Sequence, residues 1–350
     1  MVRRVGSARW FVTLVRHDGS VTILSMKAIV VRAFGGPEML KLEDVPDPSP
    51  APGQVLVRVH AVGVNPYDTY MLSGNYATKP PLPYTPGADA AGVVQDVGDG
   101  VTPAVKRGDR VYIGGTASFR SYGAYAEQVL CEPHQLHALP DRLSFAQGAA
   151  INVPYVTAWR AVHDRARLQS GETIFIHGAS GGVGLAATQI AHAWGGRVIG
   201  SASTSEGRSL IKQQGAIEAL NHREEGYLEK LKELTAGRGP DVILESLANV
   251  NLDHDLSAAG YGGRIVVIGN RGRTEIDARK AMGKDLSVYG MSMWNITRPD
   301  LERIHAGLGA AFATGALSPV VSTELALADA PRAHTLVMES GAKGKIVLTP

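Results

Sequence analysis

The sequence has a single cysteine, Cys131, among its 350 residues. One cysteine excludes an intramolecular disulfide and also a zinc site built from several cysteines. A chain that forms no disulfide fits a reducing compartment, so we expect a cytoplasmic protein. Long apolar runs are missing as well, because no stretch approaches the ~20 residues that cross a bilayer. The sequence therefore predicts neither a disulfide-stabilised secreted protein nor a membrane-spanning one.

An excess of charge of one sign is also absent. The 35 Lys and Arg residues face 33 Asp and Glu residues, which leaves a formal net charge of +2. Aromatic residues make up only 6% of the chain, and no basic stripe with interleaved aromatics occurs. Proteins that bind nucleic acids use such stripes to neutralise phosphates and to stack on bases. We therefore expect small molecules or copies of the same chain as partners, and neither RNA nor a membrane.

Glycine is the most informative residue type that the sequence does contain. The run His177-Gly178-Ala179-Ser180-Gly181-Gly182-Val183-Gly184 follows the apolar segment 173–176 and leads into a second apolar segment from Leu185. This order predicts a strand, a tight glycine turn and a helix. Glycines let the backbone turn sharply and approach a ligand, and a helix N-terminus offers N–H groups to an anion. With a further strand predicted at 197–203, the segment has the form of a dinucleotide-binding βαβ unit.

The composition and the secondary-structure pattern of the sequence change along the chain. Residues 1–25 are rich in arginine, and we expect them to be an extension that is disordered or dispensable. Residues 26–150 contain short β-branched runs separated by Gly and Pro, which predicts an antiparallel β domain. Residues 151–292 alternate strand and helix patterns, which predicts a parallel sheet with helices on both faces. Residues 293–350 are expected to return to the first domain and to end in a strand at 344–348.

The individual elements follow from the same patterns. In the β domain we expect strands at 26–31, 40–44, 54–62, 91–97, 110–113 and 125–130. In the parallel sheet we expect strands at 173–176, 197–203, 219–221, 241–245, 264–268 and 287–290, followed by an amphipathic helix over 299–314.

Several ordered motifs resemble one family. They are Gly35-Gly36-Pro37-Glu38, Gly63-Val64-Asn65-Pro66, Leu82-Pro83-Tyr84-Thr85-Pro86-Gly87, Ala91-Gly92-Val93-Val94, Lys106-Arg107-Gly108-Asp109-Arg110-Val111 and the glycine turn. From Met26 onward the chain resembles the zinc-free, zeta-crystallin-like quinone oxidoreductases of the medium-chain dehydrogenase/reductase superfamily. The resemblance implies a GroES-like β domain that holds a Rossmann domain, an α/β fold that agrees with the patterns above. It also implies the activity of an NADPH:quinone oxidoreductase, and leaves open whether the quinone takes one electron or two.

A binding role without enzymatic activity is one alternative to quinone reduction. Some zeta-crystallins accumulate as structural lens proteins or bind AU-rich RNA, but the near-zero net charge speaks against an RNA-binding role for this chain. The enzymatic alternative to quinone reduction is the NADPH-dependent reduction of an enone or alkenal double bond.

The choice of cofactor depends on the end of the second strand of the βαβ unit. NAD-preferring sites usually place an acidic residue there, to bind the ribose 2′-hydroxyl. This chain has the uncharged stretch Ser201-Ala202-Ser203-Thr204-Ser205, which leaves space for a 2′-phosphate and favours NADPH. Glu206 is the counterargument, because it could turn toward the ribose. Arg208, Arg223 and Lys343 are cations that could neutralise the phosphate.

The resemblance also assigns cofactor contacts residue by residue. They fall on Tyr70, Ser180, Gly181, Gly182, Val183, Ser203, His222, Asn251, Ile268, Gly269, Asn270, Arg271, Met291, Ser292 and Met293. Some of these residues also have a purely structural interpretation. Val183 and Ile268 could belong to the core, Asn251 could cap a helix, and His222 could be a surface histidine.

The zinc ligands of related enzymes are missing here. Alcohol dehydrogenases of the superfamily bind zinc through a cysteine and a Gly-His-Glu run, whereas this chain has Pro86-Gly87-Ala88-Asp89 in the corresponding stretch. His60, His134 and His137 do not form a ligand set with Cys131. We expect no catalytic metal, and alcohol oxidation that depends on a Lewis acid is therefore disfavoured. Quinones, or enones whose β-carbon accepts hydride, are the expected acceptors.

Asn65 and Tyr70 are the candidate catalytic residues, because they follow the strand that ends near Gly63 and would line the acceptor pocket. Tyr70 could hydrogen-bond an acceptor oxygen or the nicotinamide carboxamide, or could simply be a packed aromatic residue. Asn65 could instead shape the turn before Pro66. Neither is expected to be an obligatory acid. The segment 263–269 is expected near the edge of the parallel sheet, where pairing would give a homodimer or homotetramer, although the same residues equally suit a monomer's core.

Overall fold

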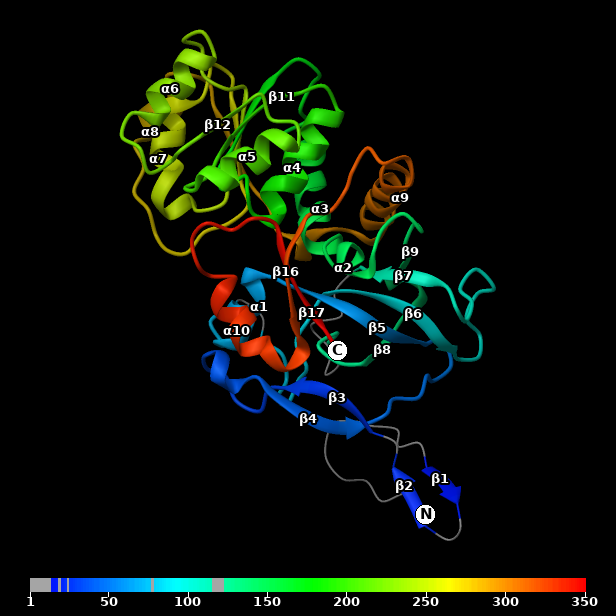
Figure 1. The fold of residues 1–350 in the computed structure, drawn as a ribbon. Coiled ribbons are helices and arrows are strands. Elements are labelled where there is room, and N and C mark those ends of the chain that lie inside the picture. The colour runs from blue at the N-terminus through cyan, green and yellow to red at the C-terminus, as the bar shows by residue number, and fades with distance from the viewer. Residues whose placement is uncertain (1–13, 18–19, 24, 77–78, 115–122) are drawn as a thin grey trace. The chain divides into compact units, whose positions relative to one another are not determined.

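The computed structural model describes residues 14–17, 20–23, 25–76, 79–114 and 123–350. The chain divides into two compact units, drawn in Figure 1. Unit 1 comprises residues 1–152, 323–339 and 346–350, and unit 2 comprises residues 153–322 and 340–345. The boundary after the parallel sheet thus lies at 322/323, whereas the sequence patterns placed it at 292/293. The difference arises because helix α9 (Arg298–Thr314) groups with unit 2.

The main sheet of unit 1 has seven strands. Its order is β16 (Val321–Ala326), β17 (Lys345–Thr349), β5 (Val55–Val64), β6 (Asp89–Val97), β7 (Arg110–Ile113) and β9 (Leu136–Ala138), with β8 (Gln128–Cys131) also paired to β5. The last strand, β17, pairs antiparallel with β5, so the predicted return of the C-terminal strand to the first domain is confirmed. The pattern of β5 explains its central place, because eight of its ten residues are buried.

Two smaller sheets and several short helices make up the rest of the described part of unit 1. Strands β3 (Ser25–Val30) and β4 (Lys41–Pro46) form one antiparallel pair. Strands β1 (Leu14–His17) and β2 (Ser20–Ile23) form another, within the segment predicted to be an extension. The helices are η1 (Pro37–Met39), α1 (Pro66–Leu72), η3 (Pro133–Gln135), α2 (Phe145–Gly148), η6 (Leu327–Asp329) and α10 (Ala330–Leu336).

Unit 2 contains a six-stranded parallel sheet. Its order is β12 (Glu218–Leu220), β11 (Arg197–Ser201), β10 (Thr173–Ile176), β13 (Val242–Glu245), β14 (Arg264–Val267) and β15 (Ser287–Gly290). In chain order this is 3-2-1-4-5-6, the arrangement of a Rossmann fold. Strands β10 and β13 are buried along their whole length, which explains why three of the four residues in each are apolar.

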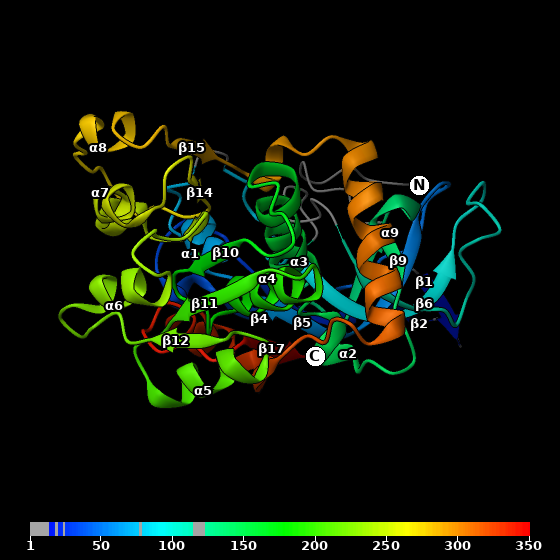
Figure 2. The same cartoon turned by 90° about the horizontal axis from the view of Figure 1, so that it is seen from above.

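Helices cover both faces of this sheet. Helices α4 (Gly182–Ala193) and α5 (Ser205–Gln213) lie on one face, and α6 (Tyr227–Leu234) and α7 (Ala248–Ala258) lie on the other (Figure 2). The remaining helices are α3 (Asn152–Trp159), which starts at the end of unit 1, the π-helix η4 (Arg160–Arg165), α8 (Ala278–Met282) and η5 (Met293–Asn295). Among the described residues, none of the helices has both the length and the apolar character needed to cross a membrane.

One detail of the parallel sheet differs from the sequence patterns, and the position of its edge agrees with them. Strand β11 ends at Ser201, so Ser203 lies in the turn beyond it rather than in the strand. The segment predicted near the sheet edge, now β14, is indeed the second strand in, because β15 pairs with its outer side. The true edge of the described sheet on this side is therefore β15.

Candidate functional site

The candidate cofactor residues of unit 2 all follow the carboxyl ends of its strands. Because the six strands are parallel, these ends lie along one edge of the sheet. Ser180, Gly181, Gly182 and Val183 follow β10, Ser203 follows β11, His222 follows β12, Asn251 follows β13, Ile268, Gly269, Asn270 and Arg271 follow β14, and Met291, Ser292 and Met293 follow β15. In open parallel sheets ligands bind at this edge, at the point where the strand order reverses, here between β10 and β13.

The glycine turn after β10 is built by close backbone packing. Gly178 has a φ of +59°, a conformation that favours glycine. A Cβ at Gly184 would lie 2.5 Å from the Cα of Ala179, so this position has no room for a side chain. Gly181 is different, because its nearest neighbour would be the Gly178 carbonyl oxygen at 3.5 Å, an ordinary contact. Helix α4 starts at Gly182, and the N–H groups of its first turn have no intrahelical acceptors and can bind an anion.

The C-terminal segment 340–345, hereafter the closing segment, packs against this turn. The N–H of Gly344 donates to the carbonyl of Ser180 at 2.8 Å, and Gly344 forms a parallel bridge with Gly181. The same segment reaches the turn after β11, because a Cβ at Gly341 would lie 3.2 Å from Cγ2 of Thr204. The closing segment therefore lies beside both turns to which the cofactor phosphates were assigned.

Positive charge gathers at the turn after β11. Thr204 caps α5 by accepting from the N–H of Gly207 at 3.1 Å. A backbone hydrogen bond and then the charge of Lys343 lower the pKa of Glu206, with a smaller contribution from Arg208. Arg223 donates to Oγ of Ser340 at 2.9 Å, which ties it to the closing segment. Two of the three candidate cations, Lys343 and Arg208, thus help to lower the pKa of Glu206. The third, Arg223, contacts the closing segment.

The loops after β13, β14 and β15 are fixed by hydrogen bonds. Asn251 lies in the first turn of α7 and its Nδ2 donates to Oε1 of Glu245 at 3.3 Å. A Cβ at Gly269 would lie 2.4 Å from the Ser246 carbonyl oxygen, so the two loops cross closely there. Ser292 accepts from the N–H of Trp294 at 3.3 Å as the cap of η5. These contacts give each loop one defined path past the sheet edge.

Beneath the sheet edge lies a group of three buried ionisable residues, His177, Glu245 and Asp255, hereafter the buried cluster. His177 Nε2 is 2.8 Å from Oδ1 of Asp255 and 3.4 Å from Oε2 of Glu245. It is the one group of three His, Cys, Asp or Glu residues with ligand atoms within 4.8 Å of one another in the described part of the chain. Sequence reasoning missed Glu245 and Asp255. The available signal was a carboxylate that ends the apolar run Val242-Ile243-Leu244-Glu245.

The two candidate catalytic residues lie in unit 1, on and just before helix α1. Asn65 is buried and directly precedes the helix. Its backbone N–H donates to Oδ2 of Asp68 at 2.9 Å, and its Nδ2 donates to Oδ2 of Asp89 at 3.0 Å. Asn65 therefore shapes the turn before Pro66, as its structural interpretation predicted, and is held by a carboxylate that sequence reasoning missed. Tyr70 is half-buried in the same helix.

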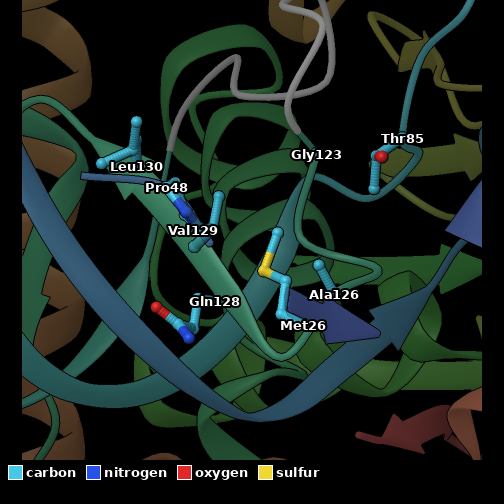
Figure 3. Close-up of a pocket in the computed structure, with 8 residues that line it drawn as sticks. All are labelled: Met26, Pro48, Thr85, Gly123, Ala126, Gln128, Val129 and Leu130. Atoms are coloured by element: carbon cyan, nitrogen blue, oxygen red, sulfur yellow. The ribbon is translucent and has the colours of Figure 1, made fainter. Parts of the chain in front are cut away.

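A small hollow in unit 1 is lined by other residues than Asn65 and Tyr70 (Figure 3). Its lining consists of Met26, Pro48, Thr85, Gly123, Ala126, Gln128, Val129 and Leu130. Neither Asn65 nor Tyr70 is among them. All the predicted cofactor contacts except Tyr70 follow the strand ends of unit 2.

Known families and proteins match almost the whole chain. The family described as "Alcohol dehydrogenase GroES-like domain" matches residues 51–141, and the family described as "Zinc-binding dehydrogenase" matches residues 182–306. A human quinone oxidoreductase is 47% identical over 325 residues, which cover 92% of this chain and 97% of that protein. The crystal structure of the Escherichia coli quinone oxidoreductase complexed with NADPH has a TM-score of 0.84 and 31% identity, covering 93% of this chain and all of that one.

A second solved structure is equally similar in fold. The crystal structure of an NAD-dependent alcohol dehydrogenase has a TM-score of 0.87 and 30% identity, covering 93% of this chain and all of that one. The fold is therefore shared by enzymes of different specificity, whereas the sequence identity is highest to the human quinone oxidoreductase among these three. Together with the Rossmann strand order and the glycine turn, this identity over nearly the full length shows that the chain belongs to the quinone oxidoreductases of the medium-chain dehydrogenase/reductase superfamily.

Proposed function

We propose that the protein is an NADPH-dependent quinone oxidoreductase that uses no metal. The observation that carries the cofactor assignment is the uncharged turn at Ser203, which lies beside the cations of the closing segment and of α5. The names of the curated relatives, quinone oxidoreductases of mammals and of Pseudomonas aeruginosa, carry the assignment of the acceptor.

The residues of unit 2 fit a dinucleotide phosphate. A pyrophosphate needs a backbone that it can approach closely. Gly181 has open space beside it, whereas the backbone of Ala179 fills the space beside Gly184. The N–H groups that begin α4 can donate to its oxygens. Ser180, Gly181, Gly182 and Val183 would hold the pyrophosphate, and Ser203 the adenosine ribose. His222 would lie at the adenine, and the loops after β13, β14 and β15 would hold the nicotinamide half.

The 2′-phosphate distinguishes NADPH from NADH. An acidic side chain at the end of β11 would repel that phosphate, and this position carries serines instead. Lys343 and Arg208 supply positive charge close to Glu206, which offsets the repulsion between that carboxylate and a 2′-phosphate. The solved E. coli quinone oxidoreductase with NADPH supports the same choice.

Bound NADPH supplies the reducing equivalents, and the protein's contribution is to hold the two reactants in place. Asn65 and Tyr70 are proposed to line the acceptor site. The amide of Asn65 is engaged with Asp89, so we assign Asn65 to holding the shape of the α1 turn. Tyr70 is the residue proposed to contact the acceptor or the carboxamide.

A comparison of two acceptors tests the activity. Steady-state rates are measured with NADPH and either a 1,2-quinone or a 2-alkenal, and then with NADH. A higher kcat/KM for the quinone with NADPH supports the proposal. A higher value for the alkenal assigns the protein to the double-bond reductases, and a preference for NADH refutes the cofactor assignment.

The variant Tyr70→Phe tests the role of that hydroxyl. A contact with the acceptor or the carboxamide predicts a changed KM for quinone or a changed Kd for NADPH. Normal values for both, with normal turnover, remove Tyr70 from the site.

The edge of the unit 2 sheet is the proposed interface of a homo-oligomer. Strand β15 is an edge strand, and Val288 on it is 44% exposed. The large apolar side chains of Tyr261 and Met282 are also exposed, at 83% and 76%. Unpaired edges and exposed apolar side chains favour association with a second copy. Light scattering on the wild type and on Val288→Lys tests this, with a smaller particle expected for the variant.

The single cysteine is consistent with the proposed cytoplasmic location.

A further inference from the structure

Glu245 connects the separate loops of the candidate cofactor site. Its backbone carbonyl accepts from the N–H groups of Ile268 and Gly269, at 2.7 and 3.3 Å. Its side-chain Oε1 accepts from the N–H of Leu247 and from Nδ2 of Asn251. One residue therefore fixes the start of α7 and the loop after β14. Both segments carry residues assigned to the cofactor.

The buried cluster extends this connection to the glycine turn. His177 directly precedes Gly178, and its ring lies against both carboxyl groups of the cluster. Glu245 and Asp255 have no exposed surface, and His177 has 5%. The cluster therefore joins the ends of β10 and β13 to helix α7 in an environment that excludes water.

The cluster also has two carboxyl oxygen atoms that lack hydrogen-bond partners. Oε2 of Glu245 and Oδ2 of Asp255 are buried and accept no hydrogen bond within the described residues. Leaving such oxygens unpaired is unfavourable. The ligand atoms of the two carboxyl groups lie within 4.8 Å of each other, and two carboxylates at that separation repel each other. A proton held on one carboxyl group and donated to the other satisfies both oxygens and removes the repulsion. Burial, the two unpaired oxygens and the proximity of the carboxyl groups together favour a cluster that carries an extra proton.

The surrounding charges agree with this protonation. Burial is the main cause that raises the pKa of Glu245, to about 7, and burial also raises the pKa of Asp255. Burial lowers the pKa of His177, and the nearby charge of Glu245 opposes that shift. Two other ionisable groups act near the cluster. Tyr227 on α6 has a raised pKa, from burial and then from the charges of Asp255 and Glu245. His222 after β12 has a lowered pKa, from burial and then from His177.

We propose that Glu245 is a positioning residue of the cofactor site and that it shares one proton with Asp255, so that NADPH binding takes up a proton from solvent. The inference rests on the proposed function. A pyrophosphate at the glycine turn brings negative charge next to His177 and strengthens proton binding by the carboxyl pair. The pKa of the pair is then higher with NADPH bound than without it. Affinity is full below the pKa of the free protein and falls as the pH rises through the pKa of the complex, by up to ~tenfold per pH unit for one proton.

The coupling is tested by calorimetry of NADPH binding at pH 7.5 in two buffers of different ionisation enthalpy, which gives the number of protons taken up. The proteins are wild type, Glu245→Gln, Asp255→Asn and the control Glu233→Gln, which changes an exposed carboxylate of the same unit. Proton uptake by the 2′-phosphate is common to all four and cancels in the comparison. We expect greater uptake for wild type and Glu233→Gln than for the two cluster variants. Equal uptake in all four overturns the coupling. A structural role alone would weaken binding without changing the proton number.

Titration of the free protein separates this inference from the proposed function. Potentiometric titration between pH 6 and 8 is compared for wild type and Glu245→Gln, with Asp255→Asn in its place should the first variant not fold. We expect one group fewer to titrate in the variant. An unchanged curve overturns the shared proton, and so does a metal ion bound to the purified wild type in stoichiometric amount. Failure of the wild type to bind NADPH, with the titration difference present, instead refutes the proposed function.

Discussion

Alanine substitutions at two glycines of the same turn are predicted to have different effects, on stability at Gly184 and on NADPH affinity at Gly181. A Cβ at Gly184 would lie 2.5 Å from the Cα of Ala179 and 2.6 Å from the Gly178 carbonyl oxygen. Relieving these overlaps must move the turn, and overpacking of this kind typically costs ~1–3 kcal/mol. Alanine's better helix propensity offsets up to ~1 kcal/mol. Gly184→Ala should therefore lose up to about 2 kcal/mol of stability, which lowers Tm by a few degrees.

Gly181 has space for a methyl group and an extended backbone with φ −78°. Gly181→Ala should therefore keep the wild-type Tm. Its methyl group would separate the backbone from a bound pyrophosphate and weaken hydrogen bonds to a charged group, which are worth ~1.5–3 kcal/mol. We expect NADPH affinity to fall about 10–100-fold, measured by fluorescence titration. The matched control is Gly309→Ala in α9, where the new Cβ meets nothing within 4 Å. A Gly181→Ala protein that binds NADPH normally, or that melts as early as Gly184→Ala, would refute the reasoning.

Three further outcomes are expected. Ser203→Glu should move the ratio of kcat/KM values toward NADH, because a carboxylate there repels the 2′-phosphate and binds the ribose hydroxyl. Lys343→Glu should raise the KM for NADPH about tenfold and leave that for NADH nearly unchanged; equal changes would exclude a 2′-phosphate contact. Burial lowers the pKa of His334 to about 4, so the unfolded chain, with a histidine pKa of ~6.5, takes up a proton before the folded protein does. Stability should be complete above pH ~6.5 and fall by up to about 3 kcal/mol toward pH 4, and urea unfolding of His334→Gln should show a shallower fall.

The elements that sequence patterns located best are short strands of the parallel sheet. Strands β10 and β15 have the bounds that the apolar runs predict, because both are short and flanked by turn residues. The end of β11 was placed two residues too late, since the hydroxyl-rich stretch after Ser201 has no apolar pattern to mark the boundary. The hairpin of β1 and β2 had no signal that separated it from an extension.

The parts of the site that depend on contacts distant in sequence were not predictable. Asp89 and Asn65 are separated by 24 residues, and only the folded chain brings their side chains to 3.0 Å. Asp255 and His177 are 78 residues apart and meet at 2.8 Å. Local patterns locate a strand end or a glycine turn, but they do not show which buried carboxylate lies beneath it.

The bridge between Gly181 and Gly344 makes the dinucleotide site one of the last parts of the chain to be completed during synthesis. A ribosome that has released residues up to 322 has delivered the whole parallel sheet and the glycine turn, but neither Lys343 nor the hydrogen-bond donor for Ser180. With the proposed site, cofactor binding by the nascent protein is expected to wait for the closing segment. A chain shortened by premature termination would keep its parallel sheet and lose the segment that borders both phosphate positions.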